Sequence, residues 1–136
     1  MATLTQVRTG LKRTLQSING LHVYSIWPDN LIAPFVIARR QRSNKTTFSS
    51  NGAFHFELTV GVQFNTLEKA QEALAEYTDF GGTKSIIAAL EDDETLANYA
   101  EYLIIGDWAE DQSIVYPENG PEYLSAVLPL EVNIVY

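Results

Sequence analysis

The sequence predicts a single α+β domain in which a mostly antiparallel sheet of four to five strands carries helices packed on one face. Two stretches, 54–64 and 124–136, place an apolar side chain at every second residue, which is the pattern of a strand with one buried and one wet face. Two others, 4–18 and 66–78, repeat apolar residues at helical intervals. The predicted order α-β-β-β-α-α-β-β favours antiparallel pairing with the helices on one side.

The composition limits the classes of protein to which the chain can belong. Its 136 residues fit one domain over 1–136, and an apolar fraction of 46% with a charged fraction of 19% is ordinary for a globular protein. The absence of cysteine excludes disulfides, thiolate metal ligands and cysteine nucleophiles. No apolar run approaches the length of a membrane span, and the N-terminus lacks a signal-peptide pattern, so we expect a soluble protein with no membrane partner.

The first helix has clear start and stop signals. Thr3 and Gln6 have the spacing of a capping box before the helix at 4–18, and Asn19-Gly20 supplies a left-handed stop after it. A short strand is expected next, at 21–26, where the apolar pattern resumes before a Pro-containing turn.

The central part of the chain predicts a hairpin with a long arm. A short strand at 35–38 leads into the polar segment 41–52, which has no apolar period and is expected to form an extended hairpin loop whose one large apolar residue is Phe48. The long strand at 53–64 follows, and its apolar face needs helices to cover it.

The last part of the chain predicts two helices and further strands. Asn65 is the expected cap of the helix at 66–78, and Thr83 is the expected cap of a shorter helix. Strand-like segments follow at 102–107 and 113–116. The final alternating strand contains Pro129, which cannot donate to a ladder, so we expect that strand to be an edge or to be bulged there.

The net charge of −8 is divided unevenly along the chain. Residues 1–45 hold seven of the nine basic residues and one acid, a net charge of +6, whereas the remainder holds sixteen acids and two lysines, a net charge of −14. The division is either solvated surface charge that segregates by chance, or two complementary faces that meet between copies of the chain. Complementary patches on one subunit favour head-to-tail contacts, which close into rings when the rotation permits.

The residues that carry chemistry predict no active site. His55 and Glu57 share the wet face of the long strand and have the side chains for acid–base work, but a solvent-facing pair is the commoner arrangement. The acidic run 91–94 offers oxygen ligands without the ligand spacing of a calcium loop. We therefore expect no catalytic residue, no cofactor and no metal site.

The basic run at the start of the polar segment has two interpretations. Its four cations are Arg39, Arg40, Arg42 and Lys45, and they could contact phosphates. The chain is acidic overall and no aromatic platform interleaves the run, which weakens nucleic-acid binding. Docking of this arm on an acidic face of a neighbouring copy accounts for the same residues and for the charge division together.

Several segments resemble one family, the tail terminator (tail completion) proteins of long-tailed bacteriophages. The resemblance lies first in Thr3-Leu-Thr-Gln-Val-Arg-Thr-Gly-Leu-Lys, Ile18-Asn-Gly-Leu-His-Val-Tyr-Ser and Trp27-Pro-Asp-Asn-Leu-Ile-Ala-Pro-Phe-Val. It continues through the long strand, the helix at 67–77, Gly81-Gly82-Thr-Lys-Ser-Ile and Gly120-Pro-Glu-Tyr-Leu. The sequence departs from the family pattern at Phe35, where a smaller residue is expected after the proline.

The resemblance implies a non-enzymatic virion protein that forms a hexameric ring in the tail and neck, assembled in the host cytoplasm. Such a ring caps the tail tube, ends tube growth and meets the head-completion proteins, while DNA passes through its centre without sequence-specific binding. The implied partners are further copies of the chain, the tail tube protein and a head-completion or connector protein. The candidate interface residues are Arg39, Arg40, Arg42, Lys45, Phe48, His55 and Glu57.

Two other functions stay open on the sequence alone. The first is a head-to-tail connector or stopper subunit on the capsid side, which would belong to the same virion but to another layer. The second is a small soluble binding module or enzyme that uses the face of the long strand carrying His55 and Glu57.

Overall fold

The chain is described by a computed structural model over residues 3–26, 28–45, 51–93, 95–96, 99–109, 112–115 and 121–135, with the backbone alone at 40–45, 51, 112–115 and 135. Three helices and six strands lie in these ranges. In chain order they are α1 (Leu4–Gln16), β1 (His22–Tyr24), β2 (Phe35–Lys45), β3 (Asn51–Gln63), α2 (Leu67–Thr78), α3 (Ile86–Asp92), β4 (Tyr102–Ile105), β5 (Gln112–Val115) and β6 (Glu122–Val135).

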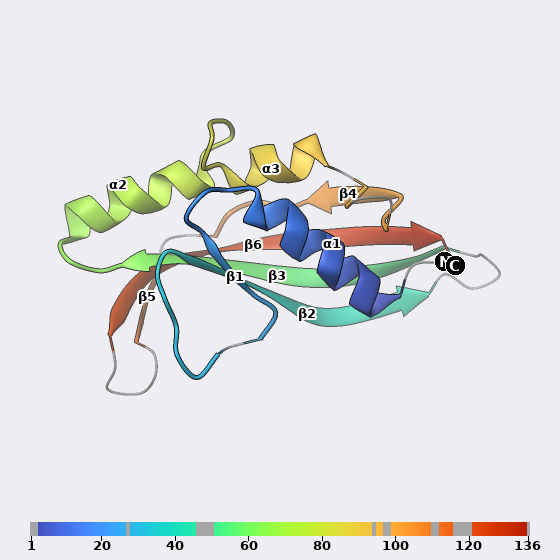
Figure 1. Ribbon diagram of the computed structural model, residues 1–136, viewed down its shortest axis with the longest axis horizontal. Helices are drawn as coiled ribbons and strands as arrows, with labels where there is room; N and C mark the ends of the chain where they lie inside the picture. The colour runs from blue at the N-terminus through green and yellow to red at the C-terminus, as the bar shows by residue number, and fades with distance from the viewer. Residues whose placement is uncertain are drawn as a thin grey trace.

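One sheet forms the centre of the described molecule (Figure 1). Its strands lie in the order β1-β2-β3-β6-β4, and β5 also pairs with β6. β6 pairs with β3 along one side, while β4 and β5 pair with different ends of its other side. The sheet is therefore five strands wide, because β4 and β5 share the outer position. Only the pair β1–β2 is parallel among these described strands, so the predicted α+β class with a mostly antiparallel sheet is confirmed.

The helices cover one face of the sheet, as predicted. Apolar side chains of all three helices join the alternate residues of β2, β3 and β6 in one core. Leu11 of α1, Leu74 of α2 and Leu90 of α3 are fully buried in it, as are Leu58 of β3 and Leu128 of β6. Because this core takes the even-numbered residues of β3 and β6, their odd-numbered residues lie on the opposite face. No helix in the described part of the chain is long and apolar enough to cross a membrane.

Local sequence sets the start of α1 as predicted. The Thr3 hydroxyl accepts a hydrogen bond from the Gln6 amide at 3.2 Å, and the Thr3 amide donates to the Gln6 side chain at 3.0 Å, which completes the capping box. The helix ends at Gln16 with Ser17 as its cap, before the predicted end at residue 18. Gly20, with a φ of +82°, lies in the turn that follows and is not the stop of the helix. The caps of the other two helices differ from the prediction, since Thr66 replaces Asn65 and Ser85 replaces Thr83.

Strand pairing extends further into the segment 41–52 than predicted. β2 continues to Lys45 and β3 begins at Asn51, with Lys45 opposite Gly52 in the ladder. Residues 46–50, which include Phe48, lie outside the described residues. A strand ladder is made by backbone groups, so a polar stretch without an apolar period can pair as well as an apolar one. The hydrophobic pattern reports burial and therefore misses this part of the hairpin.

Pro129 lies inside the sheet, where the sequence predicts an edge or a bulge. β6 keeps a continuous register with β3 through the pair of Glu57 and Pro129. The Pro129 carbonyl accepts a hydrogen bond from the Gly106 amide at 2.9 Å, so it points away from β3 toward the outer position. The ring nitrogen of an antiparallel residue faces the same side as its carbonyl. The backbone N–H that Pro129 lacks would therefore point toward the region just beyond the end of β4. Its absence removes no hydrogen bond between β6 and β3.

Among the described residues, a buried cluster covers one end of the second face of the sheet. Phe35, Ile37, Leu31 and Tyr123 form a small buried cluster there, and the Tyr123 hydroxyl donates to the Leu31 carbonyl at 3.1 Å. The rings of Phe35 and Tyr123 meet edge to face, with centroids 5.3 Å apart. Phe35 is larger than the residue that the resemblance leads one to expect. Its side chain is nevertheless fully buried in this cluster, with 0% exposed.

Candidate functional site

The other end of this second face is the first candidate site. We call it the open face and define it by Arg39 of β2, His55 and Glu57 of β3, Tyr102 and Ile104 of β4, and Glu131 and Asn133 of β6. Strand register places these residues side by side: Arg39 is opposite Glu57, His55 is opposite Glu131, and Asn133 is opposite Tyr102. Their side chains are all exposed or half-buried, because the described helices pack on the other face of the sheet.

A histidine–carboxylate pair lies at the centre of the open face. His55 Nε2 is 3.4 Å from Glu131 Oε1, and Asn133 Nδ2 donates to Glu131 Oε2 at 3.1 Å. The acid paired with His55 is thus Glu131 of β6, whereas the sequence singles out Glu57. Facing residues on neighbouring strands have Cβ atoms about 5 Å apart, closer than side chains two residues apart on one strand. Cross-strand pairing needs the register, which the sequence does not contain.

Exposed apolar side chains flank this pair. Tyr102 is 47% exposed and Ile104 is 50% exposed. A shallow hollow of about 580 Å³ lies between Ile104 and the pair, and Pro129 also lines it. The open face therefore combines two exposed large apolar side chains with partnered polar ones.

The predicted basic run begins on the open face and continues along β2. Arg39 is exposed. A bulge separates Arg40 from Arg42, after which Arg42 is opposite His55 and Lys45 is opposite Gly52. The structure describes only the backbone of Arg40, Arg42 and Lys45. It therefore brings the run into register with His55 and Glu57 at the level of the strands, and Phe48 lies outside the described residues.

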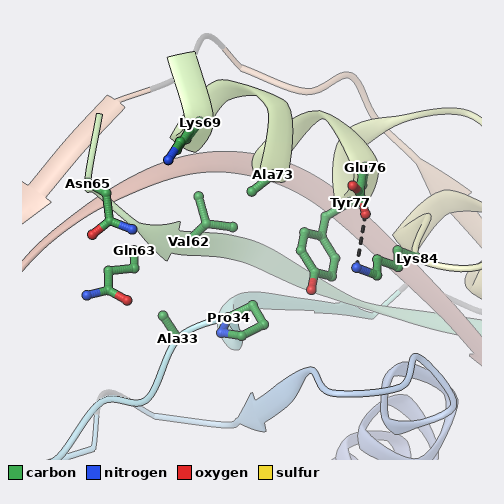
Figure 2. A pocket seen from close by; sticks show the side chains of 10 residues that line it. All are labelled: Ala33, Pro34, Val62, Gln63, Asn65, Lys69, Ala73, Glu76, Tyr77 and Lys84. Carbon is green, nitrogen blue, oxygen red and sulfur yellow. Dashed lines mark ion pairs between the residues drawn. The ribbon is translucent and has the colours of Figure 1, made fainter. Parts of the chain in front are cut away.

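A second candidate site, a pocket of about 450 Å³, lies between α2, the end of β3 and the segment before β2 (Figure 2). Its floor is apolar and includes Val62 and Pro34, and its polar residues include Lys69, Tyr77 and Lys84. Lys69 and Lys84 are the only basic residues after residue 45. The sequence analysis did not single out the pocket, although their isolation in an acidic region is a signal that could have indicated it.

Electrostatic contacts in this pocket fix the protonation of two side chains. Lys84 Nζ lies 3.0 Å from Glu76 Oε2, and this hydrogen bond raises the pKa of Lys84, so the ammonium stays charged at neutral pH. Burial raises the pKa of the Tyr77 phenol above its ordinary value of 10.0, an effect that Lys84 partly offsets. Tyr77 is therefore a neutral hydrogen-bond donor at neutral pH.

One residue of the acidic run 91–94, Asp93, forms a structural contact between two helices. Asp93 Oδ2 accepts a hydrogen bond from the Thr14 hydroxyl at 3.0 Å, which joins the end of α3 to α1. Thr14 is buried, whereas Asp92 is exposed. No group of three or more metal-ligating side chains occurs among the described residues, and Glu94 lies outside them.

Comparison of the chain with models of known protein families gave no match, and comparison with curated protein sequences also gave none. A proposal of function therefore rests on the open face, the distribution of charge and the resemblance in the sequence.

Proposed function

We propose that the protein is a structural subunit of a phage tail that forms a hexameric ring with copies of itself. The ring would cap the tail tube, end its growth and join the tail to the head-completion proteins, with DNA passing through its centre. The resemblance suggests this role, and the open face is the observation that supports it most directly. Tyr102 and Ile104 around the pair of His55 and Glu131 supply the apolar and polar mixture that subunit contacts use.

The distribution of charge supports contacts that run head to tail. The basic residues from Arg39 onward lie on β2, which leads toward the hairpin end of the molecule, whereas Glu68 and Glu72 are exposed on α2. Figure 1 shows α2 and the hairpin end at opposite ends of the long axis. Unlike charges at the two ends of one subunit attract the next copy, and a heterologous contact of this kind closes into a ring when its rotation permits.

Electron microscopy tests the ring. We expect six-fold rings in negative stain of the purified protein, either alone or after mixing with tail tubes. Replacing Arg39, Arg40 and Arg42 together by Glu is expected to weaken assembly and leave the fold intact, because it reverses the charge that the proposed contact uses. The matched control reverses two exposed cations of α1, in Lys12→Glu with Arg13→Glu, and should assemble as the original does.

The proposal would be wrong for a protein that stays monomeric and never associates with tail tubes. The role of the basic run in assembly would be contradicted if the variant with Arg39, Arg40 and Arg42 replaced by Glu unfolded at a much lower temperature than the original chain. Pull-down against tube-side and portal-side proteins separates the tail ring from a connector or stopper on the capsid side. A folded His55→Ala variant that lost a measurable turnover would favour the small enzyme instead.

A further inference from the structure

The loop between α2 and α3 carries the most exposed of the large apolar side chains in the described part of the chain. Phe80 is 81% exposed and belongs to neither of the described buried clusters. Figure 1 shows this loop extending beyond the two helices that it joins. Nothing lies within 4 Å of a Cβ built on Gly81 or on Gly82, so the tip of the loop is clear of the rest of the molecule.

Hydrogen bonds at the base of the loop hold Phe80 in place. Asp79 Oδ1 accepts a hydrogen bond from the Phe80 amide at 2.8 Å. The hydroxyl of Ser85, a residue that is 1% exposed, donates to the Asp79 carbonyl at 2.5 Å, and the Ser85 amide donates to the Gly82 carbonyl at 3.3 Å. Single exposed apolar residues are common, but one on a preorganised loop loses little entropy when a partner covers it. Phe80 therefore has the properties of an interface anchor.

The hollow on the open face has a lining that suits an aromatic ring. Ile104 and Pro129 supply apolar groups, and His55 and Glu131, which are paired with each other, supply a polar side. Gly106 adds no side chain to this lining, and a Cβ there would lie 3.2 Å from Pro129 Cβ. At about 580 Å³ the hollow has room for the side chain of a phenylalanine.

A second copy of the chain is the occupant that the charges favour. The α2–α3 loop joins helices that pack on the other face of the sheet, so Phe80 of the same chain lies away from the hollow. Residues 67–80, from α2 to Phe80, hold four acids and one lysine, whereas residues 39–45 of β2 hold four cations and no acid. β2 lies beside β3, about 5 Å from a strand that lines the hollow. A contact that seats Phe80 in the hollow can therefore also set the acidic α2 against the basic β2.

We propose that Phe80 of one copy inserts into the hollow between Ile104 and the pair of His55 and Glu131 on the next copy. The inference rests on the proposed ring and names the side chain that joins its subunits. An anchor and a hollow on opposite faces of one chain make a heterologous contact. Each copy then uses Phe80 toward one neighbour and its hollow toward the other.

Cross-linking between single-cysteine variants tests the contact. The chain contains no cysteine, so introduced thiols are the sole points of reaction. Gly81→Cys places a thiol beside Phe80 without removing it, and Tyr102→Cys places one two residues from Ile104 on the open face. Under conditions that give rings, we expect a short bismaleimide to join these two variants when they are mixed and to join neither variant to itself. Gly81→Cys mixed with Lys12→Cys, on an exposed residue of α1, should give no cross-linked product.

Substitution of the anchor gives a second measurement. Phe80→Ser should weaken the association of copies by a factor of about 10 to 100, because a large aromatic side chain is no longer buried in the contact. Its melting temperature as a monomer should not change, since Phe80 is exposed. Ile26→Ser is the matched control, because Ile26 is 69% exposed on another loop, and it should associate as the original does. Sedimentation velocity measures both.

The outcomes separate this inference from the proposed ring. Rings that give no cross-link between the Gly81→Cys and Tyr102→Cys variants would overturn the inference and leave the ring standing, as would Phe80→Ser rings as stable as those of Ile26→Ser. Cross-linking of Gly81→Cys to itself would indicate a two-fold contact and would also overturn the inference. A chain that stays monomeric, both alone and with tail tubes, would overturn the inference and the ring together.

Discussion

At the scale of single residues, Gly61 decides how the covered end of the second face packs. A Cβ built on Gly61 would lie 2.3 Å from Cζ of the Phe35 ring. The ring therefore rests directly on the backbone of β3, and from there it reaches Tyr123. In the sequence, Gly61 is only a small residue on a wet face, and its role depends on a side chain of another strand.

Gly61→Ala is expected to lower the free energy of unfolding by about 2 kcal/mol, because the added methyl group must displace a buried ring. Urea denaturation measures the loss. Gly81→Ala is the matched control, since nothing lies within 4 Å of its Cβ position, and it should change stability little. If the two variants were equally stable, the close approach of Phe35 to Gly61 would be wrong.

Titration of Tyr77 is expected to lower the free energy of unfolding as the pH rises above about 10. Its pKa is raised in the folded state above the ordinary value of 10.0, so the unfolded chain loses this proton first as the pH rises. The stabilisation is present below pH 10 and is lost as the pH rises through the folded-state pKa. Tyr77→Phe should therefore make the free energy of unfolding fall less steeply above about pH 10.

Urea unfolding from about pH 8 to about pH 11 measures this slope. Tyr102→Phe is the control, because Tyr102 is 47% exposed. An identical slope in Tyr77→Phe and in the original chain would show that the burial of the phenol contributes nothing.

At the scale of elements, α1 is held by contacts that its own sequence does not predict. A Cβ on Gly10 would lie 2.4 Å from the Leu96 carbonyl oxygen, so the turn after α3 approaches the helix backbone closely. The hydrogen bond from Thr14 to Asp93 ties the end of α3 to the same helix. Amphipathic periodicity predicts that α1 has a buried face, but it says nothing about which neighbour covers it.

Asp93→Ala is expected to lower the free energy of unfolding by about 1 to 2 kcal/mol. The substitution removes the carboxylate that accepts the hydrogen bond of the buried Thr14 hydroxyl. Asp92→Ala is the control, since Asp92 is exposed at the end of the same helix. Equal urea midpoints for the two variants would contradict a structural role for Asp93.

At the scale of the whole molecule, the basic residues of β2 lead toward one end of the long axis, and the exposed Glu68 and Glu72 of α2 lie toward the other (Figure 1). The proposed head-to-tail contact places the basic hairpin end of one copy against the acidic α2 of the next, so it should weaken as salt is added. The Debye length falls from about 8 Å at physiological ionic strength to about 3 Å at 1 M salt. We expect the assembled fraction, measured by sedimentation velocity, to fall over this range.

The variant with Glu at positions 39, 40 and 42 provides the comparison for the salt experiment. It should assemble poorly at low salt and gain rather than lose assembly as salt screens the repulsion. An assembled fraction that did not respond to salt in the original chain would assign the contact to apolar groups such as Tyr102 and Ile104.

The sequence by itself determined the fold class and the buried face of each long strand, although the predicted order of elements is one strand short of the observed order. These follow from apolar periodicity, which each segment carries alone. It also predicted the capping box at Thr3, because a cap is a contact within a single turn. Shorter signals were less complete: the polar end of the hairpin is strand, and Thr66 caps α2 one residue after the residue expected.

Only the tertiary structure decided which residues meet across strands and between helices. His55 pairs with Glu131, Phe35 rests on Gly61, and the two isolated lysines line one pocket together with Tyr77. Each of these contacts joins segments that are far apart in the chain. The physical reason is that periodicity encodes how deeply a residue is buried, whereas a site depends on strand order and register, which arise when the whole core packs.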